Sequence, residues 1–261
     1  MKVRILSMLI VLAVLASSIT ACIGTDSFLV KVMKLAPQDT YMITCVNLQT
    51  AVEDPEFNYV YDYMIDELTY TMGDIDVSDV TDAAIIETDF DYIYILMGNF
   101  DLRDIRDYLT ELEFVDGEYK EVEIWTDDYD YAVAFIGNTI VAGDTDTVEA
   151  CIRRHKNEQS SAYDNVDMKS VADKMPAAVV HVVFGPDVTY NFEVLSGGLC
   201  LRNSTSGDDV LDASGWLKFD SAMSAEDAMI EDIEDNLGWE FGITDVEARQ
   251  SGQFIEFTGD M

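Results

Sequence analysis

The sequence predicts an α+β protein in which antiparallel sheets carry helices packed on one face. Apolar, β-branched segments of strand length alternate with segments whose apolar residues recur at helical spacing, and polar turn signals separate the two kinds. Of the 261 residues, 49% are hydrophobic and 11% are aromatic. This composition provides enough apolar surface for a packed core and argues against a disordered chain.

The first half of the chain contains clear helix and turn signals. Asp54 followed by Pro55 is typical of a helix N-terminus, and Asp101 predicts the start of a second helix. Gly137-Asn138 predicts a two-residue hairpin turn. The expected helices cover residues 55–72, 102–112 and 145–155. The expected strands cover residues 41–48, 83–88, 92–98, 121–126, 131–136 and 139–142.

The second half follows a polar, turn-rich stretch at residues 157–166, with room for a short helix before Pro176. Gly197-Gly198 predicts a turn between two strands, and Gly252 predicts another near the end. Ser224 with Asp227 resembles a capping box and predicts a helix start. The expected strands cover residues 178–184, 199–202, 210–219, 243–248 and 253–257.

These elements suggest two α+β domains and a weak internal repeat. The expected organisation is a signal segment (1–21), a tether (22–39), a first domain (40–156), a linker (157–176) and a second domain (177–261). In both domains a strand leads through a Phe-Asp step, Phe100-Asp101 or Phe219-Asp220, into a helix and a strand pair. A duplicated unit is one interpretation, and chance recurrence of a common pattern is the other.

The first 25 residues have the layout of a secretory signal. Lys2 and Arg4 precede an apolar run at residues 5–16, which small residues follow. The motif Ile19-Thr20-Ala21-Cys22 resembles the lipobox of bacterial lipoproteins. The resemblance implies cleavage before Cys22, which then carries a diacylglycerol as the first residue of the mature protein. An uncleaved membrane helix is the alternative, because residues 5–25 contain no charge, although Ser17, Ser18 and Thr20 weaken it. Either anchor leaves the body outside the cytoplasm at the cell membrane.

The charge of the chain limits its partners. It has 15 basic and 51 acidic residues, a net charge of −36, which becomes −38 once Lys2 and Arg4 are removed with the signal. Such a surface repels nucleic acid and anionic lipid head groups, so the expected membrane partner is the bilayer that holds the lipid anchor. A solvated surface suited to a saline exterior, a divalent-cation site and a docking face for a basic protein are three explanations of the acidity.

Few residues suggest a metal, redox or anion site. Asp127, Asp128 and Asp130 cluster in an expected turn where carboxylates could converge on calcium, although turn chemistry explains them equally well. Cys45, Cys151 and Cys200 have apolar neighbours, which favours buried thiols over a disulfide, and their pairing stays open. Basic residues 153–156 end an expected helix, where they match the helix dipole, so end-of-helix charges are favoured over an anion site.

The sequence contains no recognisable catalytic motif. It has two histidines, His155 at a helix end and His181 inside an apolar strand, and neither is placed as the base of a nucleophile. The expected function is therefore that of a membrane-anchored lipoprotein of the cell envelope that acts as a binding or structural module with no cofactor. A carboxylate- or metal-dependent hydrolase at the cell surface is the alternative, since such enzymes need only a suitably spaced acidic pair.

Overall fold

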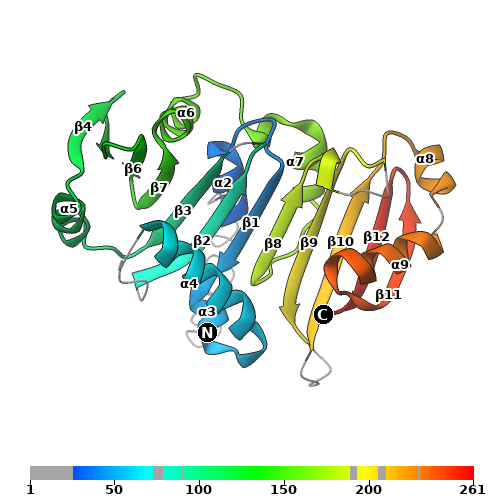
Figure 1. Ribbon diagram of the computed structural model, residues 1–261. Coiled ribbons are helices and arrows are strands. Elements are labelled where there is room, and N and C mark those ends of the chain that lie inside the picture. Colours follow the sequence, from blue (N-terminus) through cyan, green and yellow to red (C-terminus); the bar gives the residue numbers. More distant parts are fainter. Residues whose placement is uncertain (1–25, 73–78, 90, 189–192, 205–209, 229) are drawn as a thin grey trace, which may run out of the picture.

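The structure is a computed structural model that describes residues 26–72, 79–89, 91–188, 193–204, 210–228 and 230–261 (Figure 1). The lipobox motif that ends at Cys22 lies outside these residues. The chain forms helices and one twelve-stranded sheet in which every neighbouring pair of strands is antiparallel. The α+β class and the antiparallel pairing expected from the sequence are both present.

The first half of the chain supplies seven strands. Its helices are α2 (Phe28–Leu35), α3 (Leu48–Glu53), the 3-10 helix η1 (Pro55–Phe57), α4 (Asn58–Met72), α5 (Leu102–Glu111) and α6 (Thr145–His155). Its strands are β1 (Met42–Asn47), β2 (Val80–Glu87), β3 (Tyr92–Gly98), β4 (Val115–Tyr119), β5 (Val122–Thr126), β6 (Tyr131–Ile136) and β7 (Thr139–Asp144).

The second half supplies the other five strands. Its helices are η3 (Ala162–Asp164), α7 (Val166–Ala172), η4 (Pro186–Val188), α8 (Ala222–Asp227) and α9 (Ile230–Phe241). Its strands are β8 (Val180–Phe184), β9 (Ser196–Asn203), β10 (Leu211–Lys218), β11 (Thr244–Ser251) and β12 (Phe254–Asp260).

The two halves meet at the middle of the sheet. The strand order is β11-β12-β10-β9-β8-β1-β2-β3-β7-β6-β5-β4, so β1 and β8 are the strands that join the halves. They pair over five positions, from Met42 opposite Phe184 to Val46 opposite Val180. The expected domains 40–156 and 177–261 therefore share one continuous sheet.

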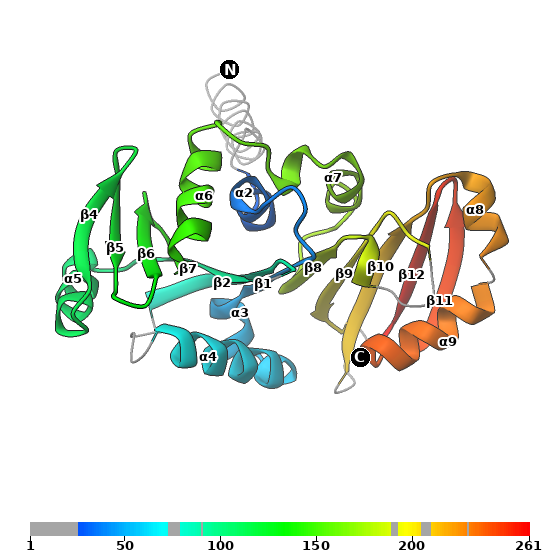
Figure 2. The same ribbon diagram turned by 45° about the horizontal axis from the view of Figure 1, so that its top comes forward.

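Helices cover both faces of this sheet, whereas the sequence predicted one covered face. Figure 2 shows α2, α6 and α7 on one side, the α2 face, and α3 and α4 on the other, the α4 face. Buried residues of α5, α8 and α9 belong to the same apolar cluster as those of α3 and α4. The α2 face has its own cluster, which includes Val32, Val148 and Met168. The central strands carry apolar side chains on both faces because a helix layer covers each one.

The expectation of a tether at residues 22–39 is wrong for the part that forms helix α2. Ser27 caps the helix through its hydroxyl, which accepts a hydrogen bond from the backbone N–H of Val30 at 3.3 Å. Leu29, Val32 and Met33 are buried against the sheet. The eight-residue helix is too short to be stable alone, so this packing is what stabilises it.

Gly197 and Gly198 correct a second expectation. They lie inside β9 rather than in a turn, with backbone partners in both β8 and β10. A Cβ at Gly198 would lie 2.8 Å from a methyl carbon of Val171 in α7, and one at Gly197 would overlap the ring of Phe184. These glycines allow neighbouring groups to approach closely, which is the other common reason for glycine in a strand.

Other differences have local causes. Strand β4 was not predicted because it is an edge strand with exposed side chains at four of its five positions. The single helix expected from Ser224 is replaced by α8 and α9, and the capping residue of α8 is Ser221, whose hydroxyl accepts from the backbone N–H of Ser224 at 3.1 Å. The expected linker 157–176 contains η3 and α7, which include the short helix anticipated before Pro176.

Among the described helices, none is long and apolar enough to span a membrane.

Replacing Met33 by Ala should show that α2 is part of the folded core. Met33 is fully buried, so we expect the free energy of unfolding to fall by about 2–5 kcal/mol. The matched control is Met223→Ala in α8, where the side chain is 69% exposed and the expected change is within about 0.5 kcal/mol. Urea unfolding followed by circular dichroism measures both. Equal stability of the two variants would show that residues 28–35 behave as a tether.

Candidate functional site

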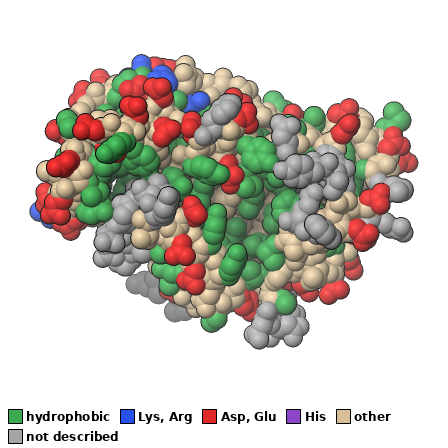
Figure 3. Space-filling view, in the orientation of Figure 1, with side chains coloured by type: hydrophobic (Ala, Val, Ile, Leu, Met, Phe, Trp, Pro, Cys, Tyr) green, Lys and Arg blue, Asp and Glu red, His purple; other side chains and the backbone are tan. Residues whose placement is uncertain are grey.

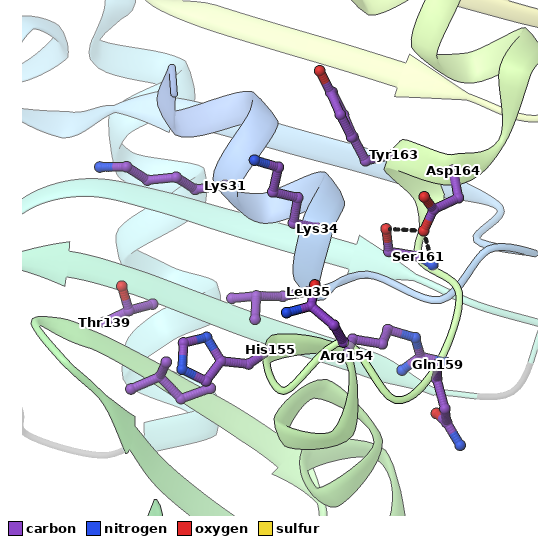
Figure 4. Close-up of a pocket in the computed structure, with 12 residues that line it drawn as sticks. Lys31, Lys34, Leu35, Thr139, Arg154, His155, Gln159, Ser161, Tyr163 and Asp164 are labelled. Atoms are coloured by element: carbon purple, nitrogen blue, oxygen red, sulfur yellow. Dashed lines mark hydrogen bonds between the residues drawn. The ribbon is translucent and has the colours of Figure 1, made fainter. Parts of the chain in front are cut away.

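A polar cavity of about 360 Å³ lies on the α2 face, between α2 and the end of α6. Figure 4 shows Lys31 and Lys34 on α2, with Arg154 and His155 on α6. Residues from the end of β6, from the start of β7, from the segment that connects α6 to η3 and from η3 itself complete the lining. The lining residues are Lys31, Lys34, Leu35, Ile136, Thr139, Arg154, His155, Asn157, Gln159, Ser161, Tyr163 and Asp164. We call this the α2–α6 cavity.

The end of α6 is built by local backbone bonds. Asn157 adopts a positive φ of 59°, a conformation that asparagine tolerates, and its N–H donates to the carbonyl of Arg154 at 2.8 Å. The N–H of Glu158 donates to the carbonyl of Arg153 at 2.9 Å. These bonds satisfy the last carbonyls of the helix and turn the chain toward η3. The backbone therefore ends α6 without help from the Arg154 side chain, which is free to line the cavity.

Ten of the thirteen Lys and Arg residues in the described part of the chain have a carboxylate oxygen within 4 Å. The three without such a partner are Lys31, Arg154 and Arg202. Two of these three, Lys31 and Arg154, line the α2–α6 cavity. In a chain with 51 acidic residues, a pair of unpaired cations at one cavity is an unusual arrangement.

Arg154 is only partly satisfied by the protein. Its Nε donates to the carbonyl of Ser160 at 3.2 Å, but its Nη1 is buried and has no hydrogen-bond acceptor in the described structure. The Cys151 thiol lies close to the guanidinium but is only a weak acceptor. Burial lowers the pKa of Arg154, and the nearby Cys151 and Asp39 oppose that shift. A buried, unsatisfied donor costs about 1–3 kcal/mol, so the fold holds the Arg154 guanidinium at this position at an energetic cost.

The other charged residues of the cavity are already engaged. The Lys34 ammonium lies 2.6 Å from Asp26 and 5.2 Å from the centre of the Tyr163 ring. The Asp164 carboxylate accepts from the backbone N–H of Ser161 at 2.8 Å and from its hydroxyl at 2.9 Å, as the dashed lines in Figure 4 show. The pKa of His155 is lowered by burial and by Lys156, so its ring is largely neutral at pH 7.

Two further cavities have different linings. One of about 400 Å³ lies under the start of α2 and includes Cys45, Asp82 and His181. There the Asp82 carboxylate accepts from the Asn47 amide at 2.8 Å, so the acid is already hydrogen-bonded. The other, of about 560 Å³, lies near residues 38–41 and 185–186 and contains no Lys, Arg or His. Neither lining includes a described Lys or Arg side chain without a carboxylate partner.

The histidines and cysteines do not form a catalytic pair in the described structure. His181 Nε2 lies 2.9 Å from the carbonyl of Pro176, which requires the ring hydrogen on that nitrogen. Cys45 and Cys200 flank His181 on the neighbouring strands. All three cysteines of the described chain are buried free thiols, as the sequence predicted. Burial raises the pKa of Cys151 and of Cys200 to about 12, so neither supplies a thiolate at neutral pH.

The proposed metal ligands Asp127, Asp128 and Asp130 serve a turn. The Asp127 carboxylate accepts from the backbone N–H groups of Tyr129 and Tyr131, both at 2.8 Å. The Asp130 carbonyl accepts from the Thr145 N–H at 2.7 Å, and Asp128 is exposed. No group of three or more His, Cys, Asp or Glu side chains in the described residues is arranged to hold a metal ion.

A different carboxylate pair lies beside this turn. The carboxyl groups of Asp91 and Asp144 lie close enough to interact, and the Asp91 carboxylate accepts a hydrogen bond from the Thr147 hydroxyl at 3.3 Å. The pKa of Asp144 is raised by burial, by its interaction with Asp91 and by the charges of Asp91 and Asp130. Sequence reasoning missed the pair because Asp91 and Asp144 are more than fifty residues apart in the chain, and only the pairing of β3 with β7 brings them together.

The comparisons with known proteins bear on the fold. No protein-family model matches the chain, and no curated protein matches it by sequence. A solved structure described as "Structure of crystal form I of TP0453" is similar, with a TM-score of 0.55 over 92% of this chain and 94% of that chain. The sequence identity is 6%, so the similarity extends to the fold alone.

Asp91→Asn should relieve the repulsion between the two carboxylates. We expect the free energy of unfolding at pH 7 to rise by up to about 1 kcal/mol, because Asn removes one charge and can donate to Asp144. A raised pKa means that the folded state holds its proton more tightly than the unfolded state. The repulsion therefore disappears at low pH, and the gain should shrink as the pH falls through the aspartate range near 4.

The control for this substitution is Asp89→Asn, an exposed residue of the same turn, which should change the stability little at either pH. Urea unfolding at pH 7 and at pH 3.5 provides the comparison. A variant that is less stable than the wild type at pH 7 would contradict a repulsive pair.

Proposed function

We propose that the protein is a lipid-anchored, extracytoplasmic binding module whose ligand occupies the α2–α6 cavity. The observation that carries the proposal is the pair of cations without carboxylate partners, Lys31 and Arg154, at one polar cavity of a strongly acidic protein. A cavity of about 360 Å³ is within the size range of small-molecule sites. The ligand is therefore expected to be small, polar and negatively charged.

The sequence motif that ends at Cys22 supports the anchor. The helix cap Ser27 is five positions after Cys22, a stretch that spans at most about 20 Å when fully extended. A diacylglycerol on Cys22 would thus keep α2, and with it the cavity, close to the membrane surface. The large excess of acidic over basic residues in this protein would repel nucleic acid, so the proposed ligand is not a nucleic acid.

A binding role is favoured over hydrolysis by the state of the reactive groups. The thiols of Cys151 and Cys200 are protonated at neutral pH, and the His181 ring is held by a backbone carbonyl. The Asp91–Asp144 pair lies outside the linings of the three cavities. A carboxylate-dependent hydrolase needs its acidic pair beside bound substrate, so none of these arrangements supports that alternative.

We also infer that the chain contains a duplicated unit, which the topology supports. In each half, three antiparallel strands are followed by helix and then by further strands, the last of which pairs with the third strand: β7 with β3 after β4, β5 and β6, and β12 with β10 after β11. Helices α2 and α7 each precede the first strand of a half and lie on the same face. The antiparallel β1–β8 pair then relates the halves by an approximate two-fold axis. Related sequences whose halves align no better than unrelated α+β segments would argue against duplication.

Cys22→Ser tests the anchor. We expect the wild-type chain to fractionate with membranes, to lose residues 1–21 and to carry a lipid mass at its amino end. The variant should lose both processing and the lipid, because the thiol is the attachment atom. Cys200→Ser, a substitution at a buried thiol, is the control and should be processed normally. Mass spectrometry of the mature amino end, together with membrane fractionation, gives the result. Unchanged processing of Cys22→Ser, or full-length wild-type protein in the cytosol, would refute the anchor.

A further inference from the structure

We propose that the open edge of β4 binds a basic, extended segment of another protein as an additional antiparallel strand. This edge is separate from the α2–α6 cavity, so the inference goes beyond the small ligand proposed above. The partner segment carries Lys or Arg at alternate positions, with an aromatic or other apolar residue between them.

The first support is that one side of β4 is free. The strand ends the sheet and pairs with β5 alone (Figure 1). Among the described elements, β5 is also the only one in extensive contact with it. In the described structure, no hydrogen bond joins the backbone of Asp116 or Glu118 to a group outside β5. An edge of this kind is a template for another strand.

The turn after β4 shows which backbone groups face the free side. Lys120 and Glu121 form a two-residue turn in which both φ angles are positive, 50° and 62°. Such a turn closes on a hydrogen-bonded pair, here Tyr119 with Val122, and bonded and non-bonded pairs alternate from there. Gly117 is therefore bonded to β5. The residues on either side of it direct their N–H and C=O groups toward the free side.

The opposite edge of the sheet, β11, is closed to such pairing. Its Ala248 N–H donates to the Glu234 carboxylate of α9 at 3.0 Å, and α9 packs against the strand. The register of β11 also shifts between Thr244 and Glu247, which disrupts the edge. A covering helix and a bulge are two ways in which proteins protect edge strands. Neither is present at β4 in the part of the chain that the structure describes.

The side chains of β4 determine the charge of the partner. Asp116 and Glu118 lie on one face of the strand, both are exposed, and neither has a Lys or Arg partner among the described residues. A second copy of this chain, paired antiparallel about Gly117, would place acid opposite acid, which is destabilising. A basic segment places a cation opposite each acid instead.

The other face of β4 has room for an apolar side chain. Gly117 lies between Val115, which is 64% exposed, and Tyr119. A Cβ at Gly117 would meet only atoms of Ile124, at 3.7 and 3.9 Å, which are ordinary contact distances. An aromatic side chain from a neighbouring strand can cover an edge glycine of this kind. The strand therefore fits the pattern basic, aromatic, basic.

The hairpin that carries this edge is held in place before any partner binds. The Lys120 ammonium lies 2.5 Å from the Glu158 carboxylate, and the Arg153 guanidinium donates to the Tyr119 hydroxyl at 2.7 Å. These contacts fix the end of β4 to the end of α6. Because the edge is already ordered, pairing costs little conformational entropy on the side of this protein.

The test uses the full chain in an uncharged detergent and the fluorescent peptide Ser-Thr-Lys-Phe-Lys-Thr-Ser, with binding followed by fluorescence anisotropy. We expect the same peptide with Glu in place of both Lys to bind at least about tenfold more weakly. The peptide Ser-Thr-Lys-Lys-Phe-Thr-Ser has the same charge without the alternation and should also bind more weakly. Equal binding of the two Lys peptides would show attraction by charge alone and would overturn strand pairing.

Two variants change the edge in different ways. Glu118→Pro removes an N–H that faces the free side, so it should weaken peptide binding about tenfold and leave the β4–β5 ladder intact. Asp116→Lys with Glu118→Lys should reverse the preference toward the Glu peptide, and it keeps the test valid if the proline variant does not fold. The matched control, Glu226→Lys with Asp227→Lys in α8, changes the net charge equally and should bind as the wild type does. Binding of the Lys peptide that neither edge variant weakens would refute the proposal.

Amide hydrogen exchange measured by NMR locates the contact. In the free protein the Gly117 amide should exchange more slowly than those of Asp116 and Glu118, and the peptide should slow the exchange of these two. Slowing at β11 instead, or a dimer in sedimentation that Glu118→Pro abolishes, would contradict the proposed partner. Lys31→Gln should leave peptide binding unchanged, so the β4 edge and the α2–α6 cavity can fail separately.

Discussion

The antiparallel pairing of β1 with β8 is the contact on which the rest of the structure depends. It joins two halves that would otherwise each end in an unpaired strand at the middle of the sheet (Figure 1). It also brings α2 against η3, where the Ala162 N–H donates to the Ala36 carbonyl at 3.0 Å and Pro37 forms a bridge with Ser161. The α2–α6 cavity lies at this junction. Lys31 and Arg154 are more than one hundred residues apart in the chain, and they lie beside one cavity because α2 packs on β1 and against α6, which packs on β6 and β7.

The basic residues are distributed unequally between the two faces of the sheet. Nine of the thirteen Lys and Arg residues in the described chain lie on α2, α6 or α7, just after these helices, or in ion pairs with them: Lys31, Lys34, Lys120, Arg153, Arg154, Lys156, Lys169, Lys174 and Lys218. Figure 3 views the α4 face, where acidic side chains are spread widely and few basic ones appear. Lys218 is an example of a cation held by this face. It is only 5% exposed, and its ammonium lies 2.8 Å from the Asp167 carboxylate and donates to the Ser170 hydroxyl at 2.8 Å, both on α7. The basic residues of the described chain are therefore concentrated around the α2 face.

The sequence predicted the regular elements well and the cavity poorly, for a physical reason. Capping residues such as Asp54 and Asp101 and the dipeptide Gly137-Asn138 act locally, and the structure has these elements where they were expected. Helix α2 was missed because eight residues give little periodicity, and burial against β1 stabilises it, not propensity. Gly197-Gly198 was assigned to a turn because close packing against Phe184 and Val171 has no local signal. A tether at residues 22–39 gives no reason to place Lys31 near residues 153–156. The sequence therefore accounts for residues 153–156 by the helix dipole alone.

The net charge of −36 and an anion site are compatible because the two act over different distances. At physiological ionic strength the Debye length is about 8 Å, so exposed charges on the α4 face that lie farther than this from the α2–α6 cavity act on it only weakly through the solvent. An anion in the cavity responds mainly to the groups that line it, where two cations lack partners and the one acidic side chain, Asp164, is hydrogen-bonded to Ser161. The acidic surface outside the cavity also restricts which anions the protein can bind. Since most basic residues of this chain are held by carboxylates within 4 Å, a polyanion finds few free cations elsewhere on the described surface.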